Sequence, residues 1–430
     1  MQSTLALTLA LCIVVTLPAG NAWSVSLFSG FNASGTKELI WGMDTLNDPC
    51  RKLRILPANV LYVRNNDCGP RIGGYRDLNC DGMVLNLSIF ISLLSTMTLS
   101  DAYGLSKGPL LQQVTQPVIH GEGPHWDARK QVLYFIDTTG KSAHKYDPHT
   151  GQTAYTSLGD AVGVMVPVEG SLDEFVAGVG RDLVLVQWDG NSTQSRSTVL
   201  DSVEPDKPGN RFNDGKADAK GRLWIGTIGY EDASGVRPNE GNLYDYSSET
   251  CKLRTSVTGI TTSNGIAWSR DNRHMYYIDT GTSRIDVFDY DIATGHISNR
   301  RPVFDLKANN VPGYPDGMTI DTEGYLWVAC YLGSRVIKVD PRDGRLKLSI
   351  HLPVEKVTSV MFGGANLDIL YVTTSRRDLS PAQLTLQPMA GSVLAVTRLG
   401  SKGWPANRAV LCNKYYEQGS NPSLTNSQTY

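Results

Sequence analysis

The stretch LYFIDTTGKSAHKYDPHTG, residues 133–151, sets the pattern on which most of the chain is built. It holds a short run of aromatic and β-branched residues, a turn, a second alternating run and a closing Asp-Pro-x-x-Gly turn. Alternation punctuated by Gly and Asp is typical of paired antiparallel strands. Related copies, closing on Asp-x-x-x-Gly or Asp-Pro-x-x-Gly, stand at MYYIDTGTSRIDVFDYDIATG (275–295) and LWVACYLGSRVIKVDPRDG (326–344).

Three shorter or more diverged copies complete the repeat: EFVAGVGRDLVLVQWDG from Glu174, LWIGTIG from Leu223 and LYVTTS from Leu370. A period of 41 to 52 residues, made of four short strands, is typical of β-propeller blades. A β-sandwich also spaces its strands regularly, but it does not repeat a four-strand motif. The chain is therefore predicted to be an all-β, six-bladed β-propeller. The aromatic residues that anchor the six copies are Tyr134, Phe175, Trp224, Tyr276, Trp327 and Tyr371.

The sequence outside the repeat predicts a leader, an extension and a tail. Residues 1–22 are expected to be a signal peptide, because the apolar run from Leu5 to Leu17 ends in small residues. Residues 23–105 should form a poorly ordered extension, 106–412 the propeller and 413–430 a disordered tail. The leader predicts secretion; a chain that does not use the extension would be cytoplasmic.

A second apolar segment, MVLNLSIFISLLSTM at residues 83–97, has three possible interpretations. Met83 could be the true start of a chain with its own leader. The segment could instead be a buried element of the extension, or it could anchor the chain in a membrane. Because it is short for a bilayer span, no stable membrane span is expected.

The bulk composition narrows the range of partners. The chain is 41% hydrophobic and 19% charged, with a net charge of −2, which does not favour nucleic acid or an anionic membrane. The seven cysteines include no CxxC pair, so they suit neither a disulfide scaffold nor a zinc site. We expect most of those within the repeat to be apolar filler. These are Cys251, Cys330 and Cys412.

Four of the six copies carry an acidic or amide residue beside glycine, just upstream of the anchor. The innermost strand of every propeller blade lines the axial channel, so residues at equivalent positions should converge on one volume. The other two copies have Val162-Gly163 and Ser359-Val360, with no comparable acid. The four elements are Gly121-Glu122-Gly123, Asn213-Asp214-Gly215, Ser263-Asn264-Gly265 and Pro315-Asp316-Gly317.

Converging carboxylate and amide oxygens are costly unless a cation neutralises them. A donor set of oxygens, without Cys or paired His, favours a hard cation such as Ca²⁺, Mg²⁺ or Mn²⁺. The alternative is that these Asp/Asn-Gly pairs only form turns, which does not account for their absence from two copies. His120 and His125 flank Glu122 without the spacing of a helical metalloprotease site. No nucleophile elbow, phosphate loop or dinucleotide fingerprint is present.

At these residues the chain resembles the family of regucalcin (senescence marker protein), gluconolactonase and luciferin-regenerating enzyme. The matching stretches include GEGPHWD at Gly121, NRFNDGKAD at Asn210, SNGIAWS at Ser263 and GYPDGMTID at Gly313. The resemblance covers residues 110–405 and leaves out the N-terminal extension.

The resemblance implies a metal held by Glu122, Asn264 and Asp316. It implies substrate contacts from Arg211, Asn213 and Glu231. Spacing of the repeat alone would select Asp214, which lies 50 residues before Asn264. The family pattern places Asn213 at the site instead, which leaves Asp214 a supporting residue.

The resemblance also implies a metal-dependent lactonase of gluconolactonase type, with a sugar lactone as small-molecule substrate. The expected cofactor is one divalent cation, Ca²⁺ first, with Zn²⁺, Mg²⁺ or Mn²⁺ as alternatives. Asp316 would be catalytic, taking a proton from the attacking water and returning it to the ring oxygen. Arg211 would donate hydrogen bonds to the substrate, and Asn213 would orient it.

Two other functions stay open, because a fold does not decide a function. One is a non-enzymatic calcium-binding or regulatory protein that uses the same ring of oxygens. The other is a luciferin-regenerating-type hydrolase of another small ester.

Overall fold

The computed structural model describes residues 108–412 and three short strands before them, Ala22–Ser24 (β1), Lys37–Leu39 (β2) and Met43–Thr45 (β3). β1 and β3 pair antiparallel. The chain divides into two compact units, residues 1–107 and 108–430. Residues 1–21, 25–36, 40–42, 46–107 and 413–430 lie outside the described residues. The signal peptide, the poorly ordered extension with its apolar segment 83–97 and the disordered tail therefore stay predictions.

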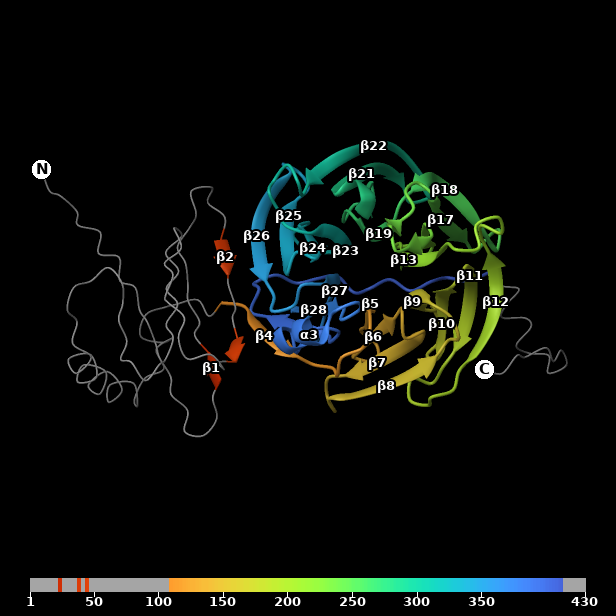
Figure 1. Ribbon diagram of the computed structural model, residues 1–430. Helices are drawn as coiled ribbons and strands as arrows, with labels where there is room; N and C mark the ends of the chain where they lie inside the picture. Colours follow the sequence, from red (N-terminus) through yellow and green to blue (C-terminus); the bar gives the residue numbers. More distant parts are fainter. Residues whose placement is uncertain (1–21, 25–36, 40–42, 46–107, 413–430) are drawn as a thin grey trace, which may run out of the picture. The chain divides into compact units, whose positions relative to one another are not determined.

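Residues 110–397 form six four-stranded antiparallel sheets around a common axis (Figure 1). The predicted all-β, six-bladed propeller is confirmed. From the axis outward, blades 1 to 3 are β5 (Gly121–Asp127), β6 (Val132–Asp137), β7 (Ser142–Asp147) and β8 (Gln152–Ser157); β9 (Val162–Pro167), β10 (Glu174–Val179), β11 (Asp182–Gln187) and β12 (Arg196–Ser202); and β13 (Arg211–Ala217), β14 (Leu223–Ile228), β17 (Gly241–Ser247) and β18 (Lys252–Ile260). Blades 4 to 6 are β19 (Ser263–Trp268), β20 (His274–Asp279), β21 (Arg284–Asp291) and β22 (His296–Asp305); β23 (Tyr314–Ile320), β24 (Leu326–Tyr331), β25 (Arg335–Asp340) and β26 (Arg345–His351); and β27 (Val357–Gly363), β28 (Ile369–Thr374), β29 (Leu394–Thr397) and β4 (Leu110–Gln113).

The ring is closed by the strand that comes first in the propeller's sequence. β4 pairs antiparallel with β29, so that Leu394 lies opposite Gln113 and Thr397 opposite Leu110. In Figure 1 the orange β4 lies beside the blue strands of blade 6. Because this closure joins the two ends of the propeller in one sheet, the blades cannot separate without breaking main-chain hydrogen bonds.

Aromatic side chains hold neighbouring blades together. Tyr134 of blade 1 meets Phe175 of blade 2 with 4.8 Å between ring centroids, and Trp126 of blade 1 stacks on Tyr371 of blade 6 at 5.5 Å. All six anchors of the repeat are buried on the second strand of their blade. Burial of a large apolar side chain stabilises a fold by about 1.5–3 kcal/mol, which explains why this position stays aromatic from blade to blade.

The Asp-x-x-x-Gly motif closes the turn between the third and fourth strands. The N–H of Gly151 donates to the carbonyl of Asp147 at 2.8 Å, and that of Gly344 to Asp340 at 2.9 Å. Both glycines have positive φ, +70° and +65°, a conformation that a residue without a side chain adopts at no steric cost.

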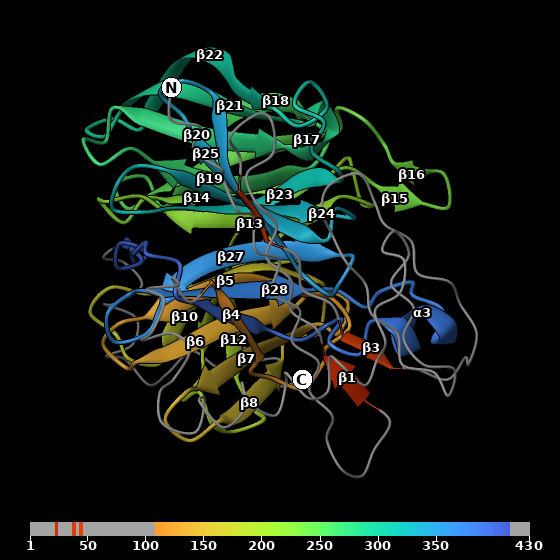
Figure 2. The same cartoon turned by 90° about the vertical axis from the view of Figure 1, so that its left-hand side faces the viewer.

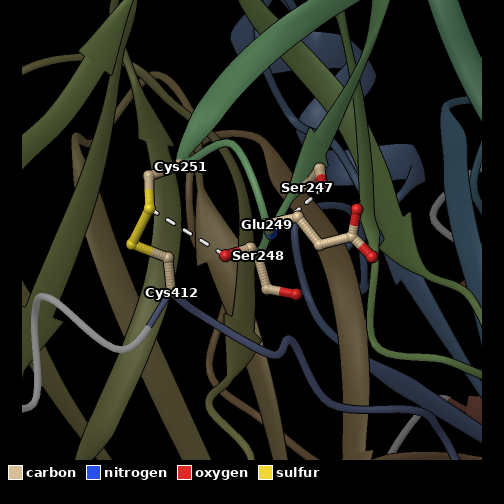
Figure 3. The surroundings of a disulfide bond; sticks show 5 residues. All are labelled: Ser247, Ser248, Glu249, Cys251 and Cys412. Carbon is tan, nitrogen blue, oxygen red and sulfur yellow. Dashed lines mark hydrogen bonds between the residues drawn. A yellow bond between two sulfur atoms is a disulfide. The ribbon is translucent and has the colours of Figure 1, made fainter.

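The segment after β29, residues 398–412, is a strap that crosses one end of the propeller. Main-chain N–H groups of Gly403, Ala409 and Val410 donate to carbonyls of blades 6, 2 and 3, respectively. The strap ends at Cys412, which forms a disulfide with Cys251 in the turn between β17 and β18 (Figure 3). The prediction that the cysteines of the repeat are apolar filler is therefore wrong for this pair, because their separation of 161 residues gives no local signal. Cys330 is a buried free thiol, as expected.

Candidate metal and substrate site

All the predicted site residues except Glu231 lie where the inner strands β5, β13, β19 and β23 begin. Each strand carries a β-bulge there, in which two of its residues oppose one residue of the second strand. A β-bulge re-aims side chains and is common beside active sites. The starts of the inner strands lie at the end of the channel opposite the strap, so these side chains gather at that end, the mouth of the channel.

The bulges decide which residues are equivalent. Asn213, Asn264 and Asp316 are each the first bulge residue of their strand, whereas Asp214 is a second bulge residue, equivalent to Gly265. Equal spacing along the chain therefore selects Asp214, which is one residue past the equivalent position, Asn213. In blade 1 the bulge comprises Gly123 and Pro124, with Glu122 just before it. The second bulge position is tightly packed in blade 5, where a Cβ on Gly317 would lie 1.9 Å from Ser359 Oγ.

A chain of hydrogen bonds runs through blades 3, 4 and 5. Arg211 Nη1 donates to Asn213 Oδ1 at 3.0 Å, and Asn213 Nδ2 donates to Asn264 Oδ1 at 2.9 Å. Asn264 Nδ2 donates to Thr280 Oγ1 at 2.6 Å, and that hydroxyl donates to the carbonyl of Pro315 at 2.8 Å. Because the Thr280 hydroxyl uses its proton on a carbonyl, it can only accept from Asn264. The amide nitrogen of Asn264 is therefore held toward Thr280 and its oxygen toward Asn213.

Three carboxyl groups lie close enough to repel one another. Burial and then the charge of Asp214 raise the pKa of Glu122 to about 8. Burial, followed by the charges of Glu122 and Asp214, raises the pKa of Asp316 well above its usual range. Burial also raises the pKa of Asp214, against the opposing charge of Lys216. This arrangement suits a cation, which would stabilise all three carboxylates at once.

The channel below the carboxyl groups is filled. A cavity of about 20 Å³ remains there, lined by Asp214, Gly215, Lys216 and residues of blades 1, 2 and 6; that is room for about one water molecule. Lys216 Nζ donates to the carbonyl of Met318 at 2.7 Å. The filled part of the channel therefore leaves no room for a substrate molecule below the carboxyl groups.

An ion pair between two loops lies at the mouth. Glu231 stands in the hairpin β15 (Glu231–Asp232) and β16 (Gly235–Val236) of blade 3, and Arg377 in the connection between β28 and β29 of blade 6. Arg377 Nη1 donates to Glu231 Oε2 at 3.0 Å, which joins loops from opposite sides of the ring. Figure 2 shows this hairpin and helix α3 (Pro381–Leu386), which follows Arg377, projecting on the same side. Glu231 therefore lies at the rim, and Glu122, Asn264 and Asp316 lie deeper.

Comparison with known proteins decides the family. The description of the matching family model is "SMP-30/Gluconolactonase/LRE-like region", and it matches residues 120–376. Human regucalcin is 40% identical over 284 residues, which are 66% of this chain and 92% of that protein. The chain belongs to the SMP-30/gluconolactonase/LRE-like family.

Solved structures agree with this family. A luciferin-regenerating enzyme is 39% identical with a TM-score of 0.67, over 71% of this chain and all of that one. A regucalcin from Agrobacterium tumefaciens, described as a calcium-binding protein, is 24% identical with a TM-score of 0.61, over 70% of this chain and 96% of that one. A gluconolactonase from Xanthomonas campestris shares the fold at 19% identity and a TM-score of 0.54, over 70% of this chain and 93% of that one.

This member of the SMP-30/gluconolactonase/LRE-like family holds further residues at its mouth to which sequence analysis gave no role in the site. His120 Nδ1 lies 2.8 Å from Ser375 Oγ, and Thr280 orients Asn264. Lys356 and Arg377 come from blade 6, in which the repeat shows no acid or amide element. Their side-chain contacts, and not the repeat along the chain, single these residues out.

Two findings limit what the described part of the chain contains. Among its residues, no three His, Cys, Asp or Glu side chains gather tightly enough to form a metal site by themselves. A cation beside Glu122 and Asp316 would therefore need the amide oxygen of Asn264, or water, to complete its shell. Of the helices in the same residues, none has the length and apolar character needed to cross a membrane.

Proposed function

We propose that this protein is a metal-dependent hydrolase of small lactones, of gluconolactonase type. One observation carries the proposal: two buried carboxyl groups from separate blades, Glu122 and Asp316, lie beside an oriented amide, Asn264, and the pKa of each is raised first by burial and then by neighbouring carboxylates. Oxygen donors of this kind fit a hard divalent cation. Family membership and the gluconolactonases of the same fold support lactones as the substrate class.

Glu122, Asn264 and Asp316 would hold the cation, with Ca²⁺ the expected ion and Zn²⁺, Mg²⁺ or Mn²⁺ as alternatives. When bound, the ion would supply Lewis-acid polarisation of the lactone carbonyl. The Asp316 carboxylate accepts a proton from the attacking water and later delivers it to the ring oxygen as the ester bond breaks.

Arg211 and Asn213 position the substrate in this scheme. One Arg211 nitrogen is held by Phe212 O and Asn213 Oδ1, both at 3.0 Å. The remaining N–H groups of the guanidinium are donors for the hydroxyls or the carbonyl of the lactone. Glu231 at the rim accepts hydrogen bonds from hydroxyls farther from the reacting carbon.

A hydrolysis assay tests the proposal. The purified chain is given D-glucono-1,5-lactone with Ca²⁺, and acid release is followed before and after excess chelator. We expect turnover that the chelator abolishes and that added Ca²⁺ restores. Calcium binding without any hydrolysis would instead support a regulatory calcium-binding protein. Hydrolysis confined to non-sugar esters would support a luciferin-regenerating-type enzyme.

We also propose that the protein is secreted. The disulfide between Cys251 and Cys412 supports this, because such bonds persist in oxidising compartments and are rare in the cytosol. Mass spectrometry of the mature chain from its native source would identify the N-terminus. A start that retains the leader, together with free thiols at both cysteines, would contradict the proposal.

Thr280→Val should weaken calcium binding by about 10–100-fold, the usual cost of losing a group that orients a metal ligand. The valine keeps the shape of the side chain but cannot hold the amide nitrogen of Asn264. Calorimetric titration with Ca²⁺ measures the effect. The control is Thr282→Val in the same turn, whose hydroxyl donates to the carbonyl of Asp279 and accepts from the main-chain N–H of Arg284, so it makes no hydrogen bond to Asn264. Equal affinities in all three proteins would show that Thr280 does not orient a ligand.

The stability of the calcium-free protein should depend on pH through Glu122. Its pKa is raised from 4.5 to about 8 on folding, so the folded state holds a proton that the unfolded state releases. This stabilisation is complete below pH about 4.5 and is lost as the pH rises to about 8. Thermal unfolding should therefore show a falling Tm over this interval, and the rise in Tm caused by Ca²⁺ should grow. Glu122→Gln should flatten both curves; equally steep curves in this variant would contradict the assignment.

A further inference from the structure

Lys356 is a buried cation without a carboxylate in contact. Its side chain stands just before β27 of blade 6, and the residue is 9% exposed. Nζ donates to the carbonyl of Arg377 at 2.5 Å and lies 5.9 Å from the ring centroid of Tyr331. Among the residues that the structure describes, none forms an ion pair with it. A buried ammonium group in this state is costly unless an anion reaches it.

Lys356 belongs to a group of cations around His120. Burial, followed by the charges of Arg211, Arg377 and Lys356, lowers the pKa of the His120 imidazole to about 3, so it stays neutral. Arg377 has its own acids, Glu231 at 3.0 Å and Asp378 at 3.2 Å.

Arg211 resembles Lys356 in this respect. Its Nη1 donates to two neutral oxygens, and the acids Glu231, Glu122 and Asp160 act on it from longer range. Within the described part of the chain, Arg211 and Lys356 are thus two cations at the mouth without a carboxylate in direct contact.

The fold places both cations at the same end of the channel. Arg211 is the first residue of the inner strand β13, and Lys356 directly precedes the inner strand β27. The blades of these two strands, 3 and 6, are also joined there by the ion pair of Arg377 with Glu231. Low-dielectric surroundings make two cations without a contacting carboxylate costly and favour a ligand that brings negative charge.

We propose that Lys356 and Arg211 form an anion-binding subsite at the channel mouth, and that the lactone hydrolysed here carries a carboxylate away from its ring ester. The role of this subsite in a reaction depends on the proposed lactonase function. The carboxylate of the substrate accepts hydrogen bonds from Lys356 Nζ and the Arg211 guanidinium while the lactone carbonyl reaches toward Asp316.

The first test compares two lactones that differ only at one carbon. D-glucaro-1,4-lactone has a carboxylate where D-glucono-1,4-lactone has a hydroxymethyl group. We expect kcat/KM of the calcium-loaded protein to favour the acidic lactone by about tenfold or more, as a charged hydrogen bond provides. Lys356→Met should reduce this ratio to near one. Lys347→Met should keep it, because Lys347 pairs with Asp340 and Asp343 away from the channel. Equal constants in the wild type, or an unchanged ratio in the Lys356 variant, would overturn the subsite.

The second test needs no hydrolysis. Calorimetry compares D-glucuronate with D-glucose, which differ in the same way, on the calcium-loaded wild type. Tighter binding of glucuronate by about tenfold supports the subsite, and equal binding overturns it. If neither lactone is hydrolysed, the lactonase proposal fails while this comparison still decides the subsite. Glucuronate held by the cation alone would bind the Lys356→Met protein as tightly as the wild type, which would also overturn it.

Discussion

Asp316→Asn should abolish lactone hydrolysis. The amide cannot accept a proton from water, so kcat/KM should fall by about 10²–10⁴-fold from the loss of the base alone. Loss of a charged metal ligand should weaken Ca²⁺ binding as well. The calcium-free variant should nevertheless be at least as stable as the wild type, because burial and the charges of Glu122 and Asp214 disfavour the Asp316 carboxylate.

Initial rates, calcium calorimetry and thermal unfolding of the same preparations separate these effects. Asp343→Asn is a matched control: it lies in the same blade, pairs with Lys347 at 3.0 Å and stands far out on the turn between β25 and β26. It should keep wild-type rates. Turnover by Asp316→Asn within about threefold of the wild type would remove Asp316 from the reaction, since base catalysis is worth far more.

Removal of the disulfide should produce the largest loss of stability. Cys251→Ser combined with Cys412→Ser releases the end of the strap, which is otherwise held by main-chain hydrogen bonds to three blades. Closure of a loop this long stabilises a fold by about 2–4 kcal/mol. Lactone turnover at room temperature should stay close to that of the wild type, because the strap lies at the end of the channel opposite the mouth.

Thermal unfolding with and without reductant measures this prediction. Reductant should lower the Tm of the wild type toward that of the double variant and should leave the variant itself unchanged. A wild-type Tm that is insensitive to a reductant shown to reduce Cys251 and Cys412 would contradict it. A variant that is fully stable but inactive would mean that the strap, unexpectedly, shapes the site.

The architecture was predictable because a blade is a local structure. The strands of one blade follow each other within a few tens of residues, and each needs an aromatic anchor such as Trp224 or Trp327 to pack against its neighbour. The repeat can therefore be recognised in the sequence. The candidate ligands Glu122, Asn264 and Asp316 could be proposed for the same reason, since residues at the start of inner strands converge in any propeller.

The sequence by itself thus determined the six blades, the family and the ring of oxygen side chains. Only the tertiary structure decided the closing strand β4, the disulfide, the orientation of Asn264 by Thr280 and the placement of Lys356 and Arg211 at one end of the channel. The closing strand, the disulfide and the two cations bring together different blades or chain segments far apart, and the Thr280 hydroxyl is itself oriented by Pro315 of the next blade. The geometry therefore depends on how the ring closes and leaves no period or spacing in the sequence.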